Sequence, residues 1–528
     1  MKKYFLIIFI FLSLQSFSQT YNLSELKGTE LHNSIRLNYI LIDQPNRIYE
    51  YGDGSTYQLE PSMGLFGLNY NFPLNDWLYT GAGFHGAVYG DQGGLFTLGV
   101  NLGVNTQLFK NFYFDANIHF GGGGGFRTLV NGGGIIYPNA GLQYKAKGFS
   151  FGVQYGYVNF FTGVQKGDNF SFFLEIPSVL RTGSYADAQK TFTVNNKSKE
   201  KFWQKPAIKS VQQITFDYFF PIGASRNDGI GNFNETTPLT QTLSILGFEY
   251  QRYITDDTFI YAHVDAMYSG LVAGFMDVFI GVGKNFIETK HVNFFAKMGI
   301  GAAGGRIFPE GGLTMYPNMG ADVKITKKFG LSVHGGYHRS VGGTFEAYTT
   351  GFSFKYYGLS GGITDPKNGT LVKEIKTQGM HIHVENQTYF DVAKSGGAKN
   401  SNLQLIGLKI SYDLNKRYYL AGEASFAYEG ESGGYAHGIF GLGIKSNKIF
   451  KEKISTFVEF SGGVSGGGGI DSGEGILVRP TLGINYHAND ALSFHVAGGQ
   501  MWSPFGNVNS SNINIGLAYG LSILNAKK

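Results

Sequence analysis

The chain has 528 residues, a formal net charge of +5 and no cysteine, so no disulfide can form. It contains 78 glycines, 33 tyrosines and 46 phenylalanines, and only 15% of its residues are charged, well below the usual quarter or so. The modest, scattered charge forms no basic stripe, which excludes nucleic acid as an expected partner.

The N-terminal residues have the pattern of a secretory signal peptide. Lys2 and Lys3 precede an apolar segment, and Ser16 and Ser18 supply small residues for cleavage. We therefore expect residues 1–18 to be removed. After them no run of about 18 apolar residues occurs. If the chain enters a membrane, it must do so as a closed barrel, because hydrocarbon offers no partner to open sheet edges.

The rest of the chain consists of segments in which apolar residues alternate with polar or small ones. In residues 93–108, for example, Leu98 and Val100 alternate with Thr97 and Asn101. This alternation, with a polar face poor in charge, is typical of membrane β-barrel strands. It predicts eight strands in the first third of the chain, at 31–43, 61–73, 76–89, 93–108, 111–124, 134–146, 148–162 and 168–180.

One stretch of sequence occurs three times. GGGIIYPNAGLQY at 132–144 returns as GGLTMYPNMGADV at 311–323 and as GILVRPTLGINY at 475–486. Self-similarity at a long period indicates a repeated structural unit. We call this stretch the strand-six motif, because it covers the sixth predicted strand of each unit. Its shared residues are Pro138, Gly141, Pro317, Gly320, Pro480 and Gly483.

These patterns predict an all-β chain, an antiparallel transmembrane β-barrel with three repeats of eight strands. We expect a signal peptide at 1–18, repeats at 19–182, 210–358 and 377–528, and linkers at 183–209 and 359–376. The linkers are polar, so we expect them to be exposed to water.

The three repeats could form three barrels in tandem or a single 24-stranded barrel. Tandem barrels are favoured by the linker lengths, because neighbouring strands of one barrel are joined by short turns. They are also favoured by charges of both signs on the predicted inner face of every repeat, since an eight-stranded barrel is filled by side chains and its buried charges must pair. The predicted interior charges are Arg36, Asp115, Asp217, Glu249, Lys297, His383, Glu385, Lys409 and Glu459.

The signal peptide, the alternating strands and the polar turns resemble those of bacterial outer-membrane β-barrel proteins over nearly the whole mature chain. This resemblance implies a location in the outer membrane of a Gram-negative bacterium. It also implies outer-membrane lipids and the barrel-assembly machinery as partners. The glycine runs lack the lysine and hydroxyl residue of a phosphate-binding loop, so we expect them to serve strand geometry.

Two small clusters could carry chemistry. His381, His383 and Glu385 alternate along one strand and share a face, which is a possible set of metal ligands. We expect an interior network instead, and no metal or other cofactor.

His338-Arg-Ser340 resembles the His-x-Ser pair of outer-membrane lipid A deacylases. That resemblance would make His338 a general base and Ser340 a nucleophile, with Glu346 orienting the histidine. A structural histidine and a loop serine are the favoured interpretation. The expected function is therefore a non-catalytic structural or surface-interaction role in the cell envelope. A passive porin-like channel is the first alternative, and a lipid A-modifying enzyme is the second.

Overall fold

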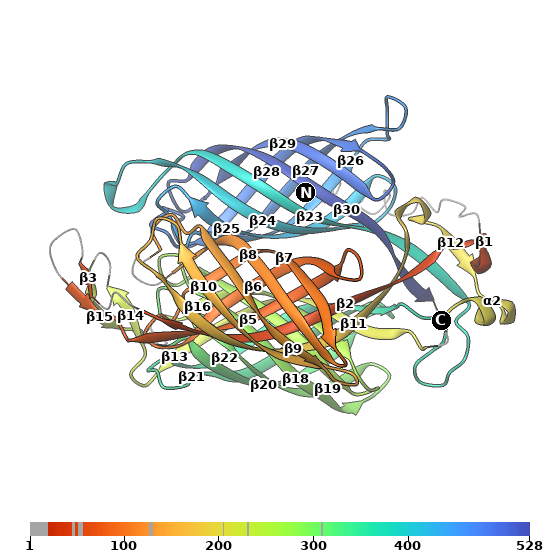
Figure 1. Cartoon of the computed structure of the whole chain (residues 1–528), viewed down its shortest axis with the longest axis horizontal. Coiled ribbons are helices and arrows are strands. Elements are labelled where there is room, and N and C mark those ends of the chain that lie inside the picture. Colours follow the sequence, from red (N-terminus) through yellow and green to blue (C-terminus); the bar gives the residue numbers. More distant parts are fainter. Residues whose placement is uncertain are drawn as a thin grey trace, which may run out of the picture.

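The computed structural model describes residues 20–44, 48–50, 56–125, 130–203, 205–229, 232–307 and 310–527. The predicted signal peptide at 1–18 lies outside these residues. Most of the described chain is β-strand (Figure 1). In the part of the chain that is described, no helix is both long and apolar enough to cross a membrane.

The first group of strands closes on itself. Each strand pairs antiparallel with the next, and the last pairs with the first from Asn169 opposite Ile42 to Gly183 opposite Gly28. We call this group ring 1. Its strands are β2 (Gly28–Asp43), β5 (Ser62–Pro73), β6 (Leu78–Tyr89), β7 (Phe96–Phe109), β8 (Phe112–Gly124), β9 (Ile135–Lys145), β10 (Ser150–Phe160) and β11 (Lys166–Ser184).

The second group, ring 2, closes in the same way through pairing of its last strand with its first, from Ile208 opposite Ser360 to Ile222 opposite Glu346. Its strands are β13 (Ile208–Ile222), β16 (Leu243–Tyr253), β17 (Thr258–Ser269), β18 (Met276–Glu288), β19 (Val292–Gly304), β20 (Leu313–Lys324), β21 (Phe329–Ser340) and β22 (Glu346–Ser360).

The third group, ring 3, closes from Glu374 opposite Lys527 to Tyr389 opposite Asn512. Two small hairpins, β3 (Ile48–Glu50) with β4 (Thr56–Gln58) and β14 (Arg226–Gly229) with β15 (Asn232–Pro238), lie in loops. The strands of ring 3 are β23 (Glu374–Val392), β24 (Ser401–Asp413), β25 (Tyr418–Glu429), β26 (Ala436–Lys445), β27 (Ile454–Gly466), β28 (Ile476–His487), β29 (Leu492–Trp502) and β30 (Asn509–Lys527). The antiparallel β-barrel fold predicted from the alternation is confirmed.

The strand-six motif has the same geometry in β9, β20 and β28. Its prolines point outward, and in each case the ladder to the next strand lacks two residue pairs at the proline and the residue before it. The register is the same on both sides of each gap. Proline has no backbone N–H to donate, so each motif interrupts the hydrogen bonding between the two strands locally and leaves their register unchanged.

The first described residues, the C-terminal residues and both linkers pack together at the short-turn end of the rings, where α2 (Asn196–Lys201), β1 (Thr20–Asn22) and β12 (Thr191–Thr193) lie (Figure 1). β12 pairs with β1 and with β23. We call this assembly the hub. Its buried apolar core is Leu23, Leu26, Phe192, Ile363, Val372, Ile375 and Leu524. The expectation of water-exposed linkers is therefore wrong for the apolar residues of these segments, because they are needed to bury one another.

The first linker also closes the mouth of a ring that it does not directly connect. The Tyr185 ring lies 4.3 Å from the His381 ring of ring 3, and its hydroxyl donates to Asp413 Oδ2 at 2.8 Å. Lys445 Nζ donates to the same hydroxyl at 2.9 Å. Burial and the neighbouring Asp413 carboxylate raise the pKa of Tyr185, so this phenol keeps its proton. The hub thus fastens ring 3 to the chain between rings 1 and 2.

Candidate functional site

The interior of ring 1 is crossed by a buried ion pair. Arg36 on β2 donates to both carboxylate oxygens of Asp115 on β8, at 2.8 and 3.0 Å. These are the first and fifth strands of the ring, so the pair spans its bore. Arg36 also reaches Glu175 at 2.7 Å, and Gln154 donates to Asp115 at 2.8 Å. Arg36 and Asp115 are 3% and 0% exposed, so these contacts lie in the interior of the ring.

Ring 3 is crossed by two such pairs. Lys409 on β24 lies 2.8 Å from Glu459 on β27 and 3.9 Å from Glu385. Arg479 on β28 donates to both oxygens of Glu423 on β25, at 2.8 and 2.6 Å. In each case the partners come from strands three apart in the ring. The two parallel hydrogen bonds from Arg479 to Glu423 are the strong form of a buried ion pair.

Ring 2 contains the same kind of pair in a more acidic interior. Lys297 on β19 lies 2.5 Å from Glu249 on β16, and Lys355 lies 2.6 Å from Asp322. His263 Nδ1 lies 2.9 Å from Glu249. In the described residues, three further buried carboxylates of this ring pair with histidines; they are Asp217, Asp265 and Asp277.

The structure places the predicted interior charges inside the rings. All but His383 are at most 7% exposed, and His383 is half-buried. Sequence reasoning examined the first, second and fifth strands of each repeat and missed partners on the others. Arg479 stands inside the strand-six motif, next to the outward-facing Pro480, and period-two alternation therefore assigns it inward. The missed interior charges are Glu175, Asp265, Asp277, Asp322, Lys355, Glu423 and Arg479.

The proposed hydrolase residues do not come together. His338 and Ser340 face the interior of ring 2 and are 0% and 1% exposed. Glu346 faces Arg339 across the β21–β22 ladder and accepts a hydrogen bond from the Tyr337 hydroxyl at 2.8 Å, on the outer face. The expectation that Glu346 orients His338 is therefore wrong, because alternation along the strands puts them on opposite faces. The acid beside His338 is Asp277, at 3.4 Å.

The predicted metal-ligand set is only partly assembled. His383 and Glu385 lie together, and the third potential ligand is His495 on β29, with the donor atoms within 4.8 Å of one another. His381 instead packs against Tyr185 at the mouth of the ring, so its place in the predicted set is wrong. Lys409 lies close to Glu385 and supplies a positive charge there without any ion.

The three rings meet around a shared centre at their long-loop end. Backbone hydrogen bonds join them in a cycle: Gly93 N to Glu310 O at 2.7 Å, Ala273 N to Gly473 O at 2.9 Å, and Gly434 N to Gly123 O at 3.0 Å. In each case the loop between the third and fourth strands of one ring contacts the next ring. Glycine has no Cβ, so the glycine-rich loops allow the backbones of neighbouring rings to approach closely.

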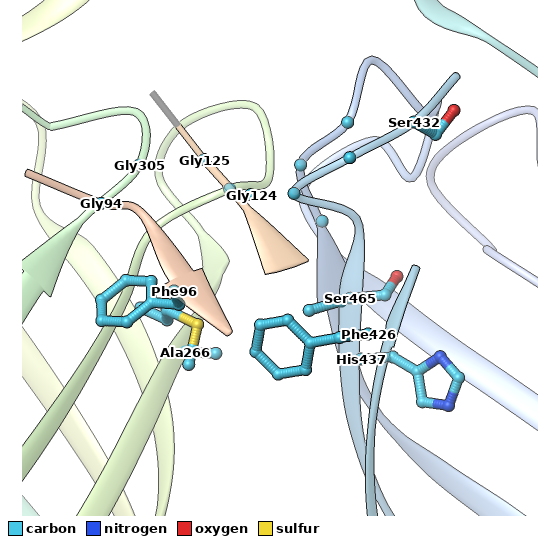
Figure 2. A pocket seen from close by; sticks show the side chains of 18 of the residues that line it. Gly94, Phe96, Gly124, Gly125, Ala266, Gly305, Phe426, Ser432, His437 and Ser465 are labelled. Atoms are coloured by element: carbon cyan, nitrogen blue, oxygen red, sulfur yellow. The ribbon is translucent and has the colours of Figure 1, made fainter. Parts of the chain in front are cut away.

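A cavity of about 420 Å³ lies at this centre. Figure 2 shows Phe96 and Phe426 from two rings below Gly94, Gly124 and Gly305, while the His437 side chain points away. The packed apolar residues beneath the loops come from all three rings: Phe96, Leu98, Ala302 and Phe426. The lining is mainly apolar and glycine-rich, and its charged or titratable residues are Arg306, Lys394, Glu431 and His437.

No protein-family model and no curated protein matches the chain. Among solved structures, the siderophore receptor PirA from Acinetobacter baumannii aligns over 95% of this chain and 81% of its own, at 9% identity and TM-score 0.26. The outer membrane channel DcaP of the same organism aligns over 95% and 99%, at 11% identity and TM-score 0.18. Pseudomonas aeruginosa OpdQ aligns over 93% and 97%, at 8% identity and TM-score 0.20.

The chain is an antiparallel β-barrel protein. Its closed antiparallel strand pairing agrees with the barrel fold that the sequence resemblance implies. At TM-scores this low, none of these solved structures carries an argument about what the chain binds or transports.

Proposed function

We propose that the chain is an integral outer-membrane β-barrel protein whose three rings are copies of one unit, and that it acts as a non-conducting structural or surface-interaction protein of the envelope. The outer faces support the membrane location. Large apolar side chains there are exposed in every ring; Phe172, Val333 and Leu482 are 60%, 62% and 62% exposed. A soluble protein rarely leaves so much apolar surface in contact with water.

The aromatic residues also fit a membrane boundary. Trp77, Phe109 and Phe329, beside short turns, are 54%, 60% and 55% exposed, and Trp502, near the opposite end of its ring, is 52% exposed. Aromatic side chains at both ends of an outward apolar band are typical of outer-membrane barrels. Outer-membrane lipids and the barrel-assembly machinery are accordingly the proposed partners.

The observation that carries the non-conducting role is the set of buried pairs that run from wall to wall. The pair of Arg36 with Asp115 alone fixes two opposite strands of ring 1 across the bore. A porin needs a continuous aqueous path, and opening one through this ring would require such pairs to be broken. Removing one partner of a buried ion pair costs roughly 3–5 kcal/mol of stability. The hub adds Tyr185 at the mouth of ring 3. The porin-like alternative therefore has less support from the interior.

The interior also bears on the enzyme alternative. An enzyme that modifies lipid A must present its nucleophile to a lipid, and Ser340 is 1% exposed inside ring 2. Glu346, the acid suggested by the resemblance, lies on the outer face, away from His338. The proposal accordingly gives the protein no catalytic activity.

Single-channel recording tests this proposal. Purified full-length protein in a planar lipid bilayer is expected to give no conductance steps. The positive control is the variant Arg36→Ser with Asp115→Ser, which removes the transverse pair from ring 1 and should permit small steps. Folding of both samples is checked by heat-modifiable electrophoretic mobility. Steps from the unmodified protein, altered in size by the double substitution, would show a channel and overturn the proposal.

A further inference from the structure

The interior of ring 2 holds an unusual collection of carboxylates and imidazoles. Asp217 on β13 and His263 and Asp265 on β17 have donor atoms within 4.8 Å of one another. They are 1%, 3% and 1% exposed. Zinc and other first-row divalent ions bind such mixtures of imidazole nitrogen and carboxylate oxygen, at about 2.0–2.2 Å.

The histidine of this group is held in the manner of a metal ligand. His263 Nδ1 lies 2.9 Å from Glu249, whose carboxylate is itself held by Lys297 at 2.5 Å and by Gln251 at 2.7 Å. A carboxylate on one ring nitrogen fixes the tautomer and aims the other nitrogen at the metal. His263 Nε2 then points to Asp265 Oδ2, 2.7 Å away.

The contact between His263 and Asp265 is an ion pair between two buried atoms that make no other hydrogen bond. A histidine nitrogen and a carboxylate oxygen this close together are placed to bind the same ion. Gly247 lies directly opposite Asp265, and Gly351 lies beside Asp217. The carboxylate oxygens of Asp265 and Asp217 occupy the space that a Cβ would fill at these two glycines.

A fourth carboxylate points to missing positive charge. Asp277 on β18 faces Asp265 directly across the ladder, and both of its oxygens are buried without a hydrogen-bond partner. Two like charges in facing positions repel, and an unpaired buried carboxylate is costly. The lysines of this interior, Lys297 and Lys355, pair with Glu249 and Asp322. In the described residues, the basic groups beside Asp217 and Asp277 are histidines, His334 at 2.5 Å and His338 at 3.4 Å. A divalent cation supplies the charge that these residues lack.

The other rings do not reproduce this set. Gly67 and Gly247 face the first strand at the same position in rings 1 and 2, so they align the two rings. With this alignment, the positions of Asp217, Asp265 and Asp277 are occupied in ring 1 by Ile40, His85 and Thr97. The corresponding residues of ring 3 are Gln387, Ser425 and His437. The acidic arrangement is therefore specific to ring 2 and is not a by-product of the shared fold.

We propose that ring 2 binds one divalent transition-metal ion through Asp217, His263 and Asp265, with Glu249 orienting His263 and Asp277 contributing charge beside the ion. The site is enclosed by the barrel wall, so the ion enters during folding and its role is structural. It adds to the pair of Lys297 with Glu249, which already crosses the interior of ring 2.

Metal analysis of the refolded protein tests this proposal. Tag-free full-length protein is refolded in detergent with ZnCl₂, dialysed against metal-free buffer and analysed by mass spectrometry. About one equivalent of zinc per chain is expected to remain. Asp217→Asn with Asp265→Asn should remove it, and Glu249→Gln should weaken binding about 10- to 100-fold. Heat-modifiable mobility shows whether each variant folds.

The matched control is Glu385→Gln, which alters the histidine–carboxylate group of ring 3 and should leave the zinc content unchanged. Refolding with CoCl₂ gives a second readout, because visible absorption of cobalt reports nitrogen and oxygen ligands in the unmodified protein. Its loss in the Asp217→Asn, Asp265→Asn variant supports the site. No retained zinc, equal zinc in that variant, or loss of zinc only in Glu385→Gln would each overturn the proposal.

Discussion

Rings 1 and 2 have the same strand order and register but differently filled interiors. In ring 1, amides form a neutral chain in which Asn69 donates to Asn38 at 3.0 Å and Asn101 donates to Asn69 at 2.9 Å. In ring 2, the position of Asn69 is occupied by Glu249, which contacts Lys297 and His263. A neutral layer in one ring thus corresponds to a charged layer in the other.

The difference separates what builds the wall from what fills it. Inward glycines and outward prolines recur in the same places, because they control how closely strands and side chains approach. The interior side chains vary, because any set that satisfies its hydrogen bonds and charges can fill an eight-stranded barrel. Differences in the interior side chains can therefore give individual rings separate roles.

The largest expected effect comes from breaking the transverse pair of ring 1. Arg36→Met leaves Asp115 buried without its cation and should lower the free energy of unfolding by about 3–5 kcal/mol. Urea unfolding in detergent, followed by heat-modifiable mobility, measures it. Adding Asp115→Leu should restore most of the loss, since an apolar pair carries no buried charge. An unchanged single variant would mean that the pair does not hold the interior.

A smaller effect is expected where the walls of different rings touch. Gly124 has φ +144°, and a Cβ there would collide with the backbone at Gly434. Gly124→Ala should lower the unfolding free energy by about 1–3 kcal/mol through overpacking. Gly148, with φ +92° and open space around it, is the control: Gly148→Ala adds backbone strain without the contact. Equal losses from both variants would mean that the rings do not pack through this glycine.

Exchanging a residue between the two interiors should give a still smaller change of opposite sign. Asp277→Thr places the ring 1 residue of that position, Thr97, in ring 2 and removes one of two facing carboxylates. In metal-free buffer the unfolding free energy should rise by roughly 0.2–1 kcal/mol, measured by the same urea titration. A clear loss of stability would show that Asp277 is already paired.

The smallest effect concerns an exposed turn of ring 2. Hydrogen bonds from Thr255 and Thr258, with Lys284 nearby, lower the pKa of Asp257 from 3.8 to about 2. Its contribution to stability is therefore present above pH 3.8 and is lost as the pH falls toward 2. Asp257→Asn should make this part of the acid dependence disappear, while Asp256→Asn should not. Identical acid unfolding profiles for all three chains would contradict it.

Much of the wall could be predicted from the sequence, because alternation and the strand-six motif are local signals. The predicted strand at 61–73 is Ser62–Pro73 in the structure, and the inward assignment of Arg36 and Asp115 follows from period two alone. The candidate site could not be found in this way. Asp265 and Asp277 lie on neighbouring strands, whereas Asp217 lies two strands from Asp265, on the far side of β16. No spacing in the sequence records how these side chains converge.

The hub was missed for a related reason. Phe192 and Leu524 are isolated apolar residues in polar or strand-like stretches, and their burial depends on contacts between segments far apart in the chain. Tyr185 likewise gives no sequence sign that it closes ring 3.

The central claim is that every group of eight strands closes on itself. The chain has no cysteine, so pairs of cysteines can be introduced at facing outward positions of the closing strands: 37 with 174, 216 with 352, and 384 with 517. Each pair should form a disulfide in the folded protein on mild oxidation, seen by mass mapping. Crosslinks between 174 and 216 or between 352 and 384, in a chain carrying all six cysteines, would instead indicate one wide ring and contradict the account.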